Sequence, residues 1–258
     1  MSENGLFSLT GKVAVVIGGG GVLGGAIATG LAQAGSDVAI LGRTKENAEA
    51  RARSIETLGR GAIGVACDAT SKTALQQTLD DVLNRFGRVD ILVNAAGVNS
   101  GTPFFEITEA EWHRILDIDL TSVFLACQVF GKAMVDAGRG GSIINISSAS
   151  SGPPLSKVFT YAVAKAGVNQ ITQFLARELA PHNVRVNAIL PGFFPAEQNR
   201  KLLTEERVAS IMGHTPMRRF GESCELVGAA VYLASQEASS FVTGSILKVD
   251  GGFTAMTI

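Results

Sequence analysis

The sequence predicts an α/β fold in which a doubly wound, parallel, seven-stranded sheet forms a single domain. Apolar, β-branched runs alternate with segments of helix length from one end of the 258-residue chain to the other. Such alternation implies parallel strand pairs, right-handed crossovers and helices on both faces of the sheet. No repeat, linker or low-complexity block interrupts it, so we expect one domain over residues 1–258.

The expected strands are short apolar runs of the kind that a parallel sheet buries on both faces. They cover residues 12–17, 37–42, 62–67, 89–94, 142–147, 184–190 and 245–249. Between them apolar residues recur at three- and four-residue spacing, as at Ile171, Phe174 and Leu175, which indicates amphipathic helices. The expected helices cover residues 22–34, 45–58, 71–86, 108–137, 159–180 and 222–235. A ligand of such a sheet binds beyond the carboxyl ends of the strands.

Residues 191–221 break this rhythm. The stretch lies between the sixth expected strand and the last expected helix, and it contains Pro191, Pro195 and Pro216 together with charges of both signs. Segments this long between regular elements usually cover or bind a ligand. We therefore expect a substrate lid here; the alternative is a surface insertion with a short helix.

Composition excludes several classes of protein. Apolar residues make up 46% of the chain, enough for a sizeable core, and Lys+Arg 22 against Asp+Glu 23 leaves no basic footprint for nucleic acid. The first residues lack a signal-peptide pattern, and no apolar run approaches the roughly 20 residues that span a bilayer. We expect a cytoplasmic protein without a membrane or nucleic-acid partner. Charged residues, at 17% against a usual figure of about 25%, indicate surface buried between subunits.

Cysteine and histidine are too few and too scattered for a disulfide framework or a metal site, so we expect no metal. These residues are Cys67, Cys127, Cys224, His113, His182 and His214. Glycine, with 30 residues, is the one compositional excess, and its clusters indicate where a ligand binds.

A glycine-rich turn follows the first expected strand. Residues 18–25 read GGGGVLGG and lead directly into an Ala-rich helix. Glycines there permit a tight turn and close approach of the backbone to a pyrophosphate, and the positive end of the helix attracts the phosphates. In this position the pattern predicts a dinucleotide-binding Rossmann fold; alone, it is only a flexible turn. The candidate residues are Gly18, Gly20, Gly21, Val22, Leu23 and Gly24.

The end of the second strand favours NADP(H) over NAD(H). An NAD site usually has Asp or Glu there for the ribose 2′-hydroxyl, whereas NADP needs a cation for its 2′-phosphate. Here the acidic position is Gly42, and Arg43 and Thr44 follow. Arg43 can pair bidentately with a phosphate; if it is only a solvated loop charge, NAD(H) remains possible. After the third strand, Asp68 and Ala69 are candidates for the adenine pocket, unless Asp68 merely caps a turn.

Tyr161 and Lys165 lie one helical turn apart at the start of an expected helix, so phenol and ammonium project from one face. A nearby cation lowers the pKa of a phenol from about 10, which lets tyrosine exchange protons near neutral pH. Ser148, at the end of the fifth strand, can orient a substrate carbonyl. Taken alone, such a Tyr–Lys pair is more often a surface pair than a site.

Together these motifs resemble the short-chain dehydrogenase/reductase family over about residues 7–253. The likeness is carried by residues 18–24, Asp68, the Asn-Ala-Ala-Gly run at 94–97, Ser148, Tyr161, Lys165, Pro191, Gly192 and the Val-Asp-Gly-Gly ending at 249–252. It implies hydride exchange between a nicotinamide and a carbonyl or alcohol, and commonly a homotetramer. It also implies that Tyr161 is the general acid/base, that Ser148 holds the reacting oxygen, and that Lys165 binds the nicotinamide ribose and lowers the pKa of Tyr161. The cofactor would then run along Asn94, Ala95, Ala96 and Gly97, with Pro191, Gly192 and Phe194 at the nicotinamide.

Within the family, the chain is most similar to the branch of D-mannonate oxidoreductases, also called fructuronate reductases. The likeness rests on the glycine turn with PGFF at 191–194, EQNR at 197–200 and HTPMRRFG at 214–221. A sugar-acid carboxylate needs a cation, which we expect from residues 191–221, unless those charges only solvate a lid or join a subunit contact. The substrate candidates are Asn99, Ser150, Phe193, Arg200 and His214, with Lys201, Arg218 and Arg219 as further cations.

Asp119 is the departure from the family pattern that matters most, because the family has a catalytic Asn there that helps hold a water behind Lys165. An aspartate can still accept that water's hydrogen bond, but its charge is expected to raise the pKa of Lys165 and to offset the effect of that lysine on Tyr161. We expect the proton relay to survive with a more alkaline optimum for oxidation; weaker catalysis is the alternative. Val22 and Ala196 also depart from the pattern.

The leading prediction is therefore an NADP(H)-preferring enzyme that acts on CH–OH groups. It would transfer a hydride between nicotinamide and a small polar ketone or secondary alcohol, a sugar acid of the D-mannonate/D-fructuronate type. Two alternatives within the enzyme class are a 3-oxoacyl-thioester reductase and a gluconate-type polyol dehydrogenase. The non-enzymatic alternative is a nucleotide-binding sensor or scaffold, against which intact Ser148, Tyr161 and Lys165 argue.

Overall fold

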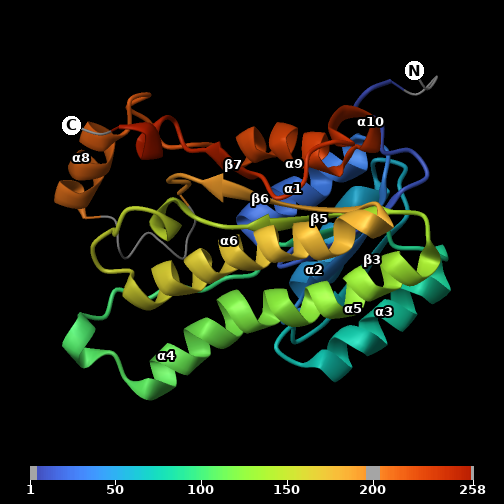
Figure 1. Cartoon of the computed structure of the whole chain (residues 1–258), viewed down its shortest axis with the longest axis horizontal. Helices are drawn as coiled ribbons and strands as arrows, with labels where there is room; N and C mark the ends of the chain where they lie inside the picture. Colours follow the sequence, from blue (N-terminus) through green and yellow to red (C-terminus); the bar gives the residue numbers. More distant parts are fainter. Residues whose placement is uncertain (1–4, 196–203, 257–258) are drawn as a thin grey trace.

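The computed structural model describes residues 5–195 and 204–256 and shows the predicted seven-stranded parallel sheet (Figure 1). The strands follow the order β3-β2-β1-β4-β5-β6-β7 across the sheet, so the predicted doubly wound fold is confirmed. Their bounds lie within two residues of the expected ones: β1 Val13–Ile17, β2 Asp37–Gly42, β3 Ala62–Ala66, β4 Ile91–Asn94, β5 Gly141–Ile146, β6 Val184–Pro191 and β7 Ile246–Val249.

Helices fill the segments between the strands. They are α1 Val22–Gln33, α2 Lys45–Glu56, α3 Lys72–Phe86, α4 Glu109–Leu116, α5 Ser122–Ala137, α6 Phe159–Leu179, α8 Glu205–His214, α9 Val227–Ala234 and α10 Gln236–Ser239. Short 3₁₀ turns are η1 Phe104–Glu106, η3 Ala149–Ser151, η4 Ala180–His182, η5 Ser223–Leu226 and η6 Phe253–Ala255. Local signals set several ends: the Ser71 hydroxyl accepts a hydrogen bond from the Ala74 N–H to begin α3, and Gly87, at φ 74°, ends it.

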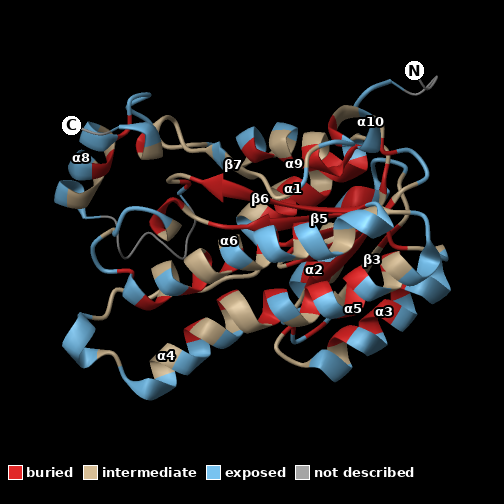
Figure 2. Ribbon diagram, viewed as in Figure 1, coloured by how far each residue is buried: buried red, intermediate tan, exposed pale blue. Residues whose placement is uncertain are grey.

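The side chains of β1 show how each face of the sheet obtains its own core. Because successive side chains of a strand point to opposite faces, Val13, Val15 and Ile17 pack in one buried cluster, and Ala14 and Val16 pack in the other. The first cluster includes the buried residues of α3, α5 and α6, and the second those of α1, α2 and α9. Figure 2 accordingly shows buried residues concentrated in the strands and on the helix sides that face them.

The segment expected as one helix over 108–137 is interrupted in the structure. Between α4 and α5 lies a π-helical turn, η2 (Asp117–Thr121), in which Asp119 is fully buried. Such turns insert an extra residue into a helix and are frequent at functional sites. The combined segment Glu109–Ala137 is long and apolar enough to meet a length-and-hydropathy criterion for a membrane span, but half of that apolar window is buried inside the fold, as in a core helix.

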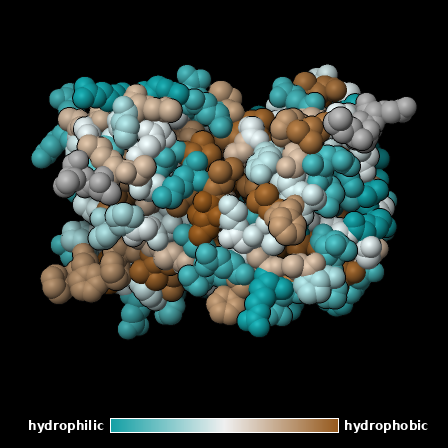
Figure 3. Space-filling model, turned by 45° about the horizontal axis from the view of Figure 1, so that its top comes forward, coloured by the Kyte–Doolittle hydropathy of each residue, from teal (hydrophilic) through white to brown (hydrophobic). Residues whose placement is uncertain are grey.

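A crevice opens at the carboxyl edge of the sheet, where the direction of winding reverses. β1 pairs with β2 on one side and with β4 on the other, so the chain leaves the ends of β1 and β4 toward opposite halves of the sheet. Figure 3 shows one face of the molecule on which apolar side chains gather in a furrow between hydrophilic margins. A ligand is therefore expected to bind next to the strand ends at Ile17 and Asn94 and the loops that follow them.

Candidate active site

A cleft of about 400 Å³ lies over the carboxyl ends of the strands and brings together residues that are far apart in the sequence. The expected site residues that line it are Gly18, Gly20, Gly21, Val22, Leu23, Gly24, Arg43, Thr44, Asp68, Ala69, Ala95, Ala96, Gly97, Asn99, Ser148, Ser150, Tyr161, Lys165, Pro191, Gly192, Phe193 and Phe194. Asn94, Asp119 and His214 do not line it, and Arg200 and Ala196 lie outside the described residues. One cavity therefore joins the expected dinucleotide end to the expected catalytic end.

The glycine turn is shaped by close backbone contacts. Gly18 has a φ of +79°, and a Cβ there would lie 2.6 Å from the Ala96 nitrogen. A Cβ at Gly24 would meet the Gly18 carbonyl oxygen, so the first turn of α1 packs directly on the loop. α1 begins after Gly21, which has no side chain to cap it, and its first N–H groups are left for a ligand in the cleft. This backbone suits a pyrophosphate.

Arg43 and Asp68 mark the opposite end of the cleft, after β2 and β3. Asp68 Oδ1 accepts hydrogen bonds from the N–H and the hydroxyl of Thr70, at 3.0 and 2.7 Å, so this carboxylate does cap a turn. These two bonds, with the nearby Arg43 guanidinium, lower the pKa of Asp68. Arg43 itself is exposed and lies within ion-pair distance of no carboxylate in the described parts of the chain. A free cation at this position suits a phosphate group.

Asn94 differs from its neighbours in the expected cofactor-binding run. Its side chain is buried under the cleft, where Nδ2 donates to Asn145 Oδ1 at 2.8 Å and contacts the Cys127 sulfur at 3.5 Å. Asn94 is expected along the cofactor, but its side chain does not line the cleft: it ties β4 to β5 on the face of the sheet that α5 and α6 cover. Ala95, Ala96 and Gly97 do line the cleft.

Ser148 and Tyr161 form the polar centre of the other end. Ser148, directly after β5, begins η3, and its Oγ lies 2.8 Å from Ser150 Oγ and accepts from the Ser150 N–H at 3.2 Å. Tyr161 projects from the first turn of α6. Burial raises the pKa of Tyr161 and the Asp119 carboxylate adds to the rise, whereas a hydrogen bond with Ser148 opposes it. The pKa of Tyr161 is therefore raised, and not lowered as expected from the neighbouring Lys165.

Lys165 and Asp119 form a buried pair beneath Tyr161. The Lys165 ammonium donates to the Ile146 carbonyl oxygen at 3.0 Å and lies 5.6 Å from the centre of the Tyr161 ring. Asp119 Oδ1 accepts from the Val98 N–H at 2.7 Å, while Oδ2 is buried without a hydrogen-bond partner among the described residues. Burial raises the pKa of Asp119 to about 6, against the attraction of Lys165. Burial lowers the pKa of Lys165, and the Asp119 charge acts in the expected upward direction against that fall.

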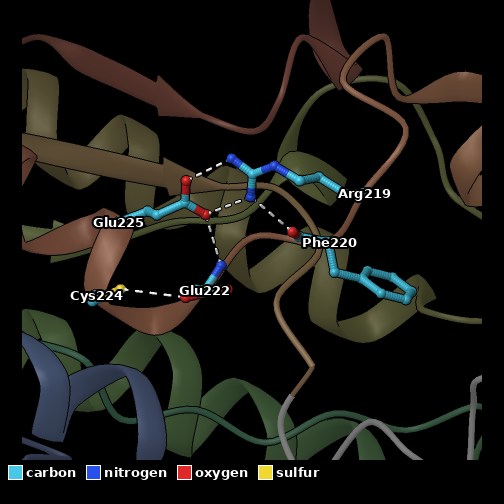
Figure 4. A network of polar contacts seen from close by, with 5 residues as sticks. All are labelled: Arg219, Phe220, Glu222, Cys224 and Glu225. Carbon is cyan, nitrogen blue, oxygen red and sulfur yellow. Dashed lines mark hydrogen bonds and ion pairs between the residues drawn. The ribbon is translucent and has the colours of Figure 1, made fainter.

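Of the cations expected to meet a substrate carboxylate, the three that the structure describes, His214, Arg218 and Arg219, do not line the cleft. The ring of His214 lies 4.9 Å from the ring of Phe253 in an edge-to-face contact, at the exposed end of α8. Arg219 is held by Glu225 through two hydrogen bonds of 2.7 and 2.6 Å, as Figure 4 shows. Arg218 is exposed and does not line the cleft, and Lys201 lies outside the described residues. In this structure His214 packs against Phe253 outside the cleft.

Arg207 is a charged site residue that the sequence patterns did not predict. It stands in the first turn of α8 and lines the cleft, together with the unexpected Asn47, Leu155, Val158 and Phe220. The sequence does contain a signal for the start of this helix, because Thr204 followed by Glu205 and Glu206 is a typical helix N-terminus. That start places Arg207 in the first helical turn, but the face it presents depends on how α8 packs.

Known proteins share this fold and these motifs. A family model described as enoyl-(acyl carrier protein) reductase, of the short-chain alcohol dehydrogenase type, matches residues 21–254. The chain is 40% identical over 269 residues to the uncharacterized oxidoreductase UxuB of Bacillus subtilis (strain 168), with 96% of each chain covered. It is 36% identical over 250 residues to the 5-keto-D-gluconate 5-reductase of Escherichia coli (strain K12), covering 96% of this chain and 98% of that one.

A solved structure gives the same result for the fold. The gluconate 5-dehydrogenase of Burkholderia cenocepacia J2315, in complex with NADP and tartrate, superposes with a TM-score of 0.94 at 33% identity, over 99% of this chain and 100% of that one. The fold and the cleft define a dinucleotide-binding oxidoreductase that acts on CH–OH groups. The chain belongs to the short-chain dehydrogenase/reductase family.

Proposed function

We propose that this enzyme interconverts a ketone and a secondary alcohol on a small sugar acid of the gluconate type, with NADP(H) as the preferred cofactor. The observation that carries the proposal is a single cleft lined at one end by an uncapped helix N-terminus and Arg43 and at the other by Ser148, Tyr161 and Lys165. Phosphate recognition and proton transfer are thus available within one cavity.

The residues present fit a nicotinamide dinucleotide. The backbone of Gly18–Gly24, which has no room for side chains at Gly18 and Gly24, supports a pyrophosphate at the start of α1. Arg43 would bind the 2′-phosphate, and Asp68 with Ala69 would border the adenine. Ala95 to Gly97, Pro191, Gly192 and Phe194 line the route to the catalytic end. A relative's structure holds NADP, which supports the preference.

The protein's own groups supply the proton chemistry. Bound nicotinamide provides the hydride for reduction and takes it up in oxidation. In reduction, the Tyr161 phenol gives its proton to the carbonyl oxygen, which Ser148 Oγ holds by a hydrogen bond, so the ketone becomes an alcohol. In oxidation, the tyrosinate takes the hydroxyl proton. Lys165, fixed by the Ile146 carbonyl, keeps a positive charge next to the phenol and favours that tyrosinate.

Asp119 takes the place of the family's Asn in this relay. One carboxylate oxygen is held by the Val98 N–H and the other has no partner among the described residues, so a hydrogen-bond donor can be received there beside Lys165. The carboxylate charge raises the pKa of Tyr161, which makes the tyrosinate harder to form. We therefore propose that the proton relay remains functional and that the pH optimum for oxidation is more alkaline.

A gluconate-type substrate is favoured over the D-mannonate/D-fructuronate type because of the names of the relatives. One is a 5-keto-D-gluconate 5-reductase and another a gluconate 5-dehydrogenase, whose structure also holds tartrate, a hydroxy dicarboxylate. The described part of residues 191–221 supports the proposed lid, since Phe193, Phe194, Arg207 and Phe220 line the cleft. The charge of Arg207 fits a sugar acid better than the long apolar chain of an acyl thioester.

We also propose that the protein is a homotetramer and that it works in a reducing compartment such as the cytoplasm. Phe124, Val163 and Phe174 leave an apolar surface on α5 and α6, of which Phe174 is 63% exposed. Such a face, together with only 17% charged residues, supports burial between subunits. All three cysteines are free thiols, which supports the compartment.

The test is NADPH absorbance decay with 5-keto-D-gluconate and with D-fructuronate, with NADH run in parallel. We expect turnover of 5-keto-D-gluconate above that of D-fructuronate, and a preference for NADPH that is lost in Arg43→Ser. A preference for D-fructuronate would instead indicate a substrate of the D-mannonate/D-fructuronate type. No turnover of either ketone, with NADPH still bound, would overturn the proposed substrate class and favour the sensor.

A further inference from the structure

Three cationic side chains line the cleft among the described residues: Arg43, Lys165 and Arg207. Arg43 lies beside Asp68, at the end that suits the adenosine phosphate. Lys165 is 3% exposed and its ammonium is held by a main-chain carbonyl beneath Tyr161. Of the cations in the described part of the chain, Arg207 is therefore the one available to a substrate, in a wall that also includes Phe193 and Phe220.

The Arg207 guanidinium is positioned by the loop that leads into α6. Nη1 donates to Ser156 Oγ at 3.0 Å and Nη2 donates to the Ser156 carbonyl oxygen at 3.1 Å. Ser156 stands five residues before Tyr161, so the same short segment orients the cation and presents the phenol. The Thr204 hydroxyl caps α8 by accepting from the Arg207 main-chain N–H at 3.3 Å, which fixes the backbone from which the Arg207 side chain extends.

Among the residues that the structure describes, no carboxylate neutralises the charge of Arg207. Elsewhere on the surface, Arg219 faces Glu225 and Lys45 faces Glu49, but in the described parts of the chain no carboxylate lies within 4.0 Å of Arg207. Its two bonds to Ser156 go to neutral oxygens and occupy two of the five N–H donors that a guanidinium carries. A positioned, half-buried guanidinium with free donors, facing a cleft with partly apolar walls, is suited to bind a carboxylate bidentately.

We propose that Arg207 binds the carboxylate of the substrate and thereby makes the enzyme select sugar acids over neutral sugars of the same length. This inference rests on the proposed function and adds to it the side chain that recognises the carboxylate of the substrate. The competing structural role is a latch, in which Arg207 only fastens α8 to the loop at Ser156. A latch would affect every substrate equally, whereas a carboxylate ligand affects only acids.

The experiment compares kcat/KM for 5-keto-D-gluconate and for D-fructose, an uncharged ketohexose, in wild type, Arg207→Gln and Ser156→Ala. We expect Arg207→Gln to lose about 10- to 100-fold on the keto acid, mainly through KM, and less than about threefold on the neutral ketose. Ser156→Ala should lose less on the acid, because the charge remains. Arg219→Gln, outside the cleft, serves as the matched control. Equal losses on both substrates, or none on the acid, would overturn the proposal.

A binding arm separates this inference from the proposed function. Calorimetric titration of the NADP⁺-loaded enzyme with D-gluconate and with sorbitol requires no turnover. We expect gluconate to bind wild type and not Arg207→Gln, and sorbitol to bind both weakly and equally. If wild type reduces no keto sugar acid yet binds gluconate through Arg207, the proposed reaction fails and the carboxylate site stands. If gluconate binds both proteins equally, the carboxylate site fails whatever the reaction.

Discussion

Asp119 places a second ionisable group against the Tyr161–Lys165 pair, where an asparagine would be neutral. Its carboxyl is fully buried, and burial and the attraction of Lys165 act on its pKa in opposite directions, with burial the stronger. With a pKa of about 6, the carboxyl group changes charge near neutral pH. The ionised form acts on Tyr161 by repelling the tyrosinate.

We predict that Asp119→Asn shifts the pH–rate profile for alcohol oxidation to lower pH. The variant removes a negative charge that raises the pKa of Tyr161, while the Asn carbonyl can still accept from the Val98 N–H. The measurement is kcat/KM for oxidation as a function of pH in both proteins. Superimposable profiles would show that the carboxylate does not act on the phenol.

The same substitution has a predicted effect on stability. Because the pKa of Asp119 is raised from 3.8 to about 6, the folded chain keeps a proton that the unfolded chain releases, and the wild type loses stability as pH rises through that window. An asparagine does not titrate, so the variant does not lose this stability. The difference in unfolding free energy between Asp119→Asn and wild type should therefore grow in favour of the variant by roughly 1–3 kcal/mol from pH 4 to pH 7. Urea titrations at both pH values measure the difference, and a constant offset would contradict it.

Individual site residues differ in how far the sequence predicts them. Tyr161 and Lys165 can be paired from their spacing, because a helix fixes which side chains share a face. Asn94 is expected at the cofactor but its side chain lies under the cleft, since a strand's side chains alternate between the two faces of the sheet and the run at 94–97 alone does not say which face Asn94 takes. Arg207 and His214 both belong to α8, and only the packing of that helix decides which of them reaches the cleft.

At the scale of elements, the β1–turn–α1 unit carries the cofactor proposal. Two separate features require glycine at position 18. Its φ is positive, and a Cβ added there would clash with the Ala96 nitrogen at a distance of 2.6 Å. Gly87, which ends α3, has a similar φ of +74°, and a Cβ added there would meet nothing within 4 Å among the described residues. It offers a matched control for the backbone conformation alone.

We predict that Gly18→Ala weakens NADPH binding at least tenfold, whereas Gly87→Ala leaves it unchanged. Both variants incur the roughly 1–2 kcal/mol of a left-handed alanine, but only Gly18→Ala displaces the backbone that supports the pyrophosphate. Fluorescence titration with NADPH gives the dissociation constants, and thermal melts confirm that both variants fold. Equal dissociation constants would exclude the glycine turn from cofactor binding.

The alternation of strands and helices is predictable for every element of the sheet, whereas the π-helical turn at Asp117–Thr121 is not. A single extra residue hardly changes the apolar pattern of residues 108–137, so the sequence favours a continuous helix. The turn matters, because it lies where Asp119 faces Lys165 across Gly97. Its position depends on tertiary packing against α6, which no local pattern records.

At the scale of the whole molecule, α5 and α6 lie side by side and carry apolar side chains that the monomer leaves exposed (Figure 1). Phe124, Val163 and Phe174 are 46%, 39% and 63% exposed. Because α6 also carries Tyr161 and Lys165, an assembly through this face would brace the helix that holds the catalytic pair. Assembly and activity are then expected to change together.

We predict that Phe174→Asp converts the proposed homotetramer to a smaller species, because a carboxylate cannot be buried in an apolar contact without a partner. Sedimentation velocity measures the change. Leu83→Asp, at a 38% exposed position on α3, is the control and should remain tetrameric. A wild type that sediments as a monomer, or a Phe174→Asp tetramer, would exclude this face as the interface.

The most direct test of the catalytic assignment separates turnover from cofactor binding in Tyr161→Phe. NADPH binding is followed by fluorescence, and reduction of 5-keto-D-gluconate by absorbance, in the variant and in wild type. We predict that turnover falls by at least about a thousandfold while the NADPH dissociation constant stays within about threefold, because the phenol gives the proton and the backbone of α1 holds the phosphates. Turnover that survives in Tyr161→Phe would contradict the role of Tyr161 and the mechanism built on it.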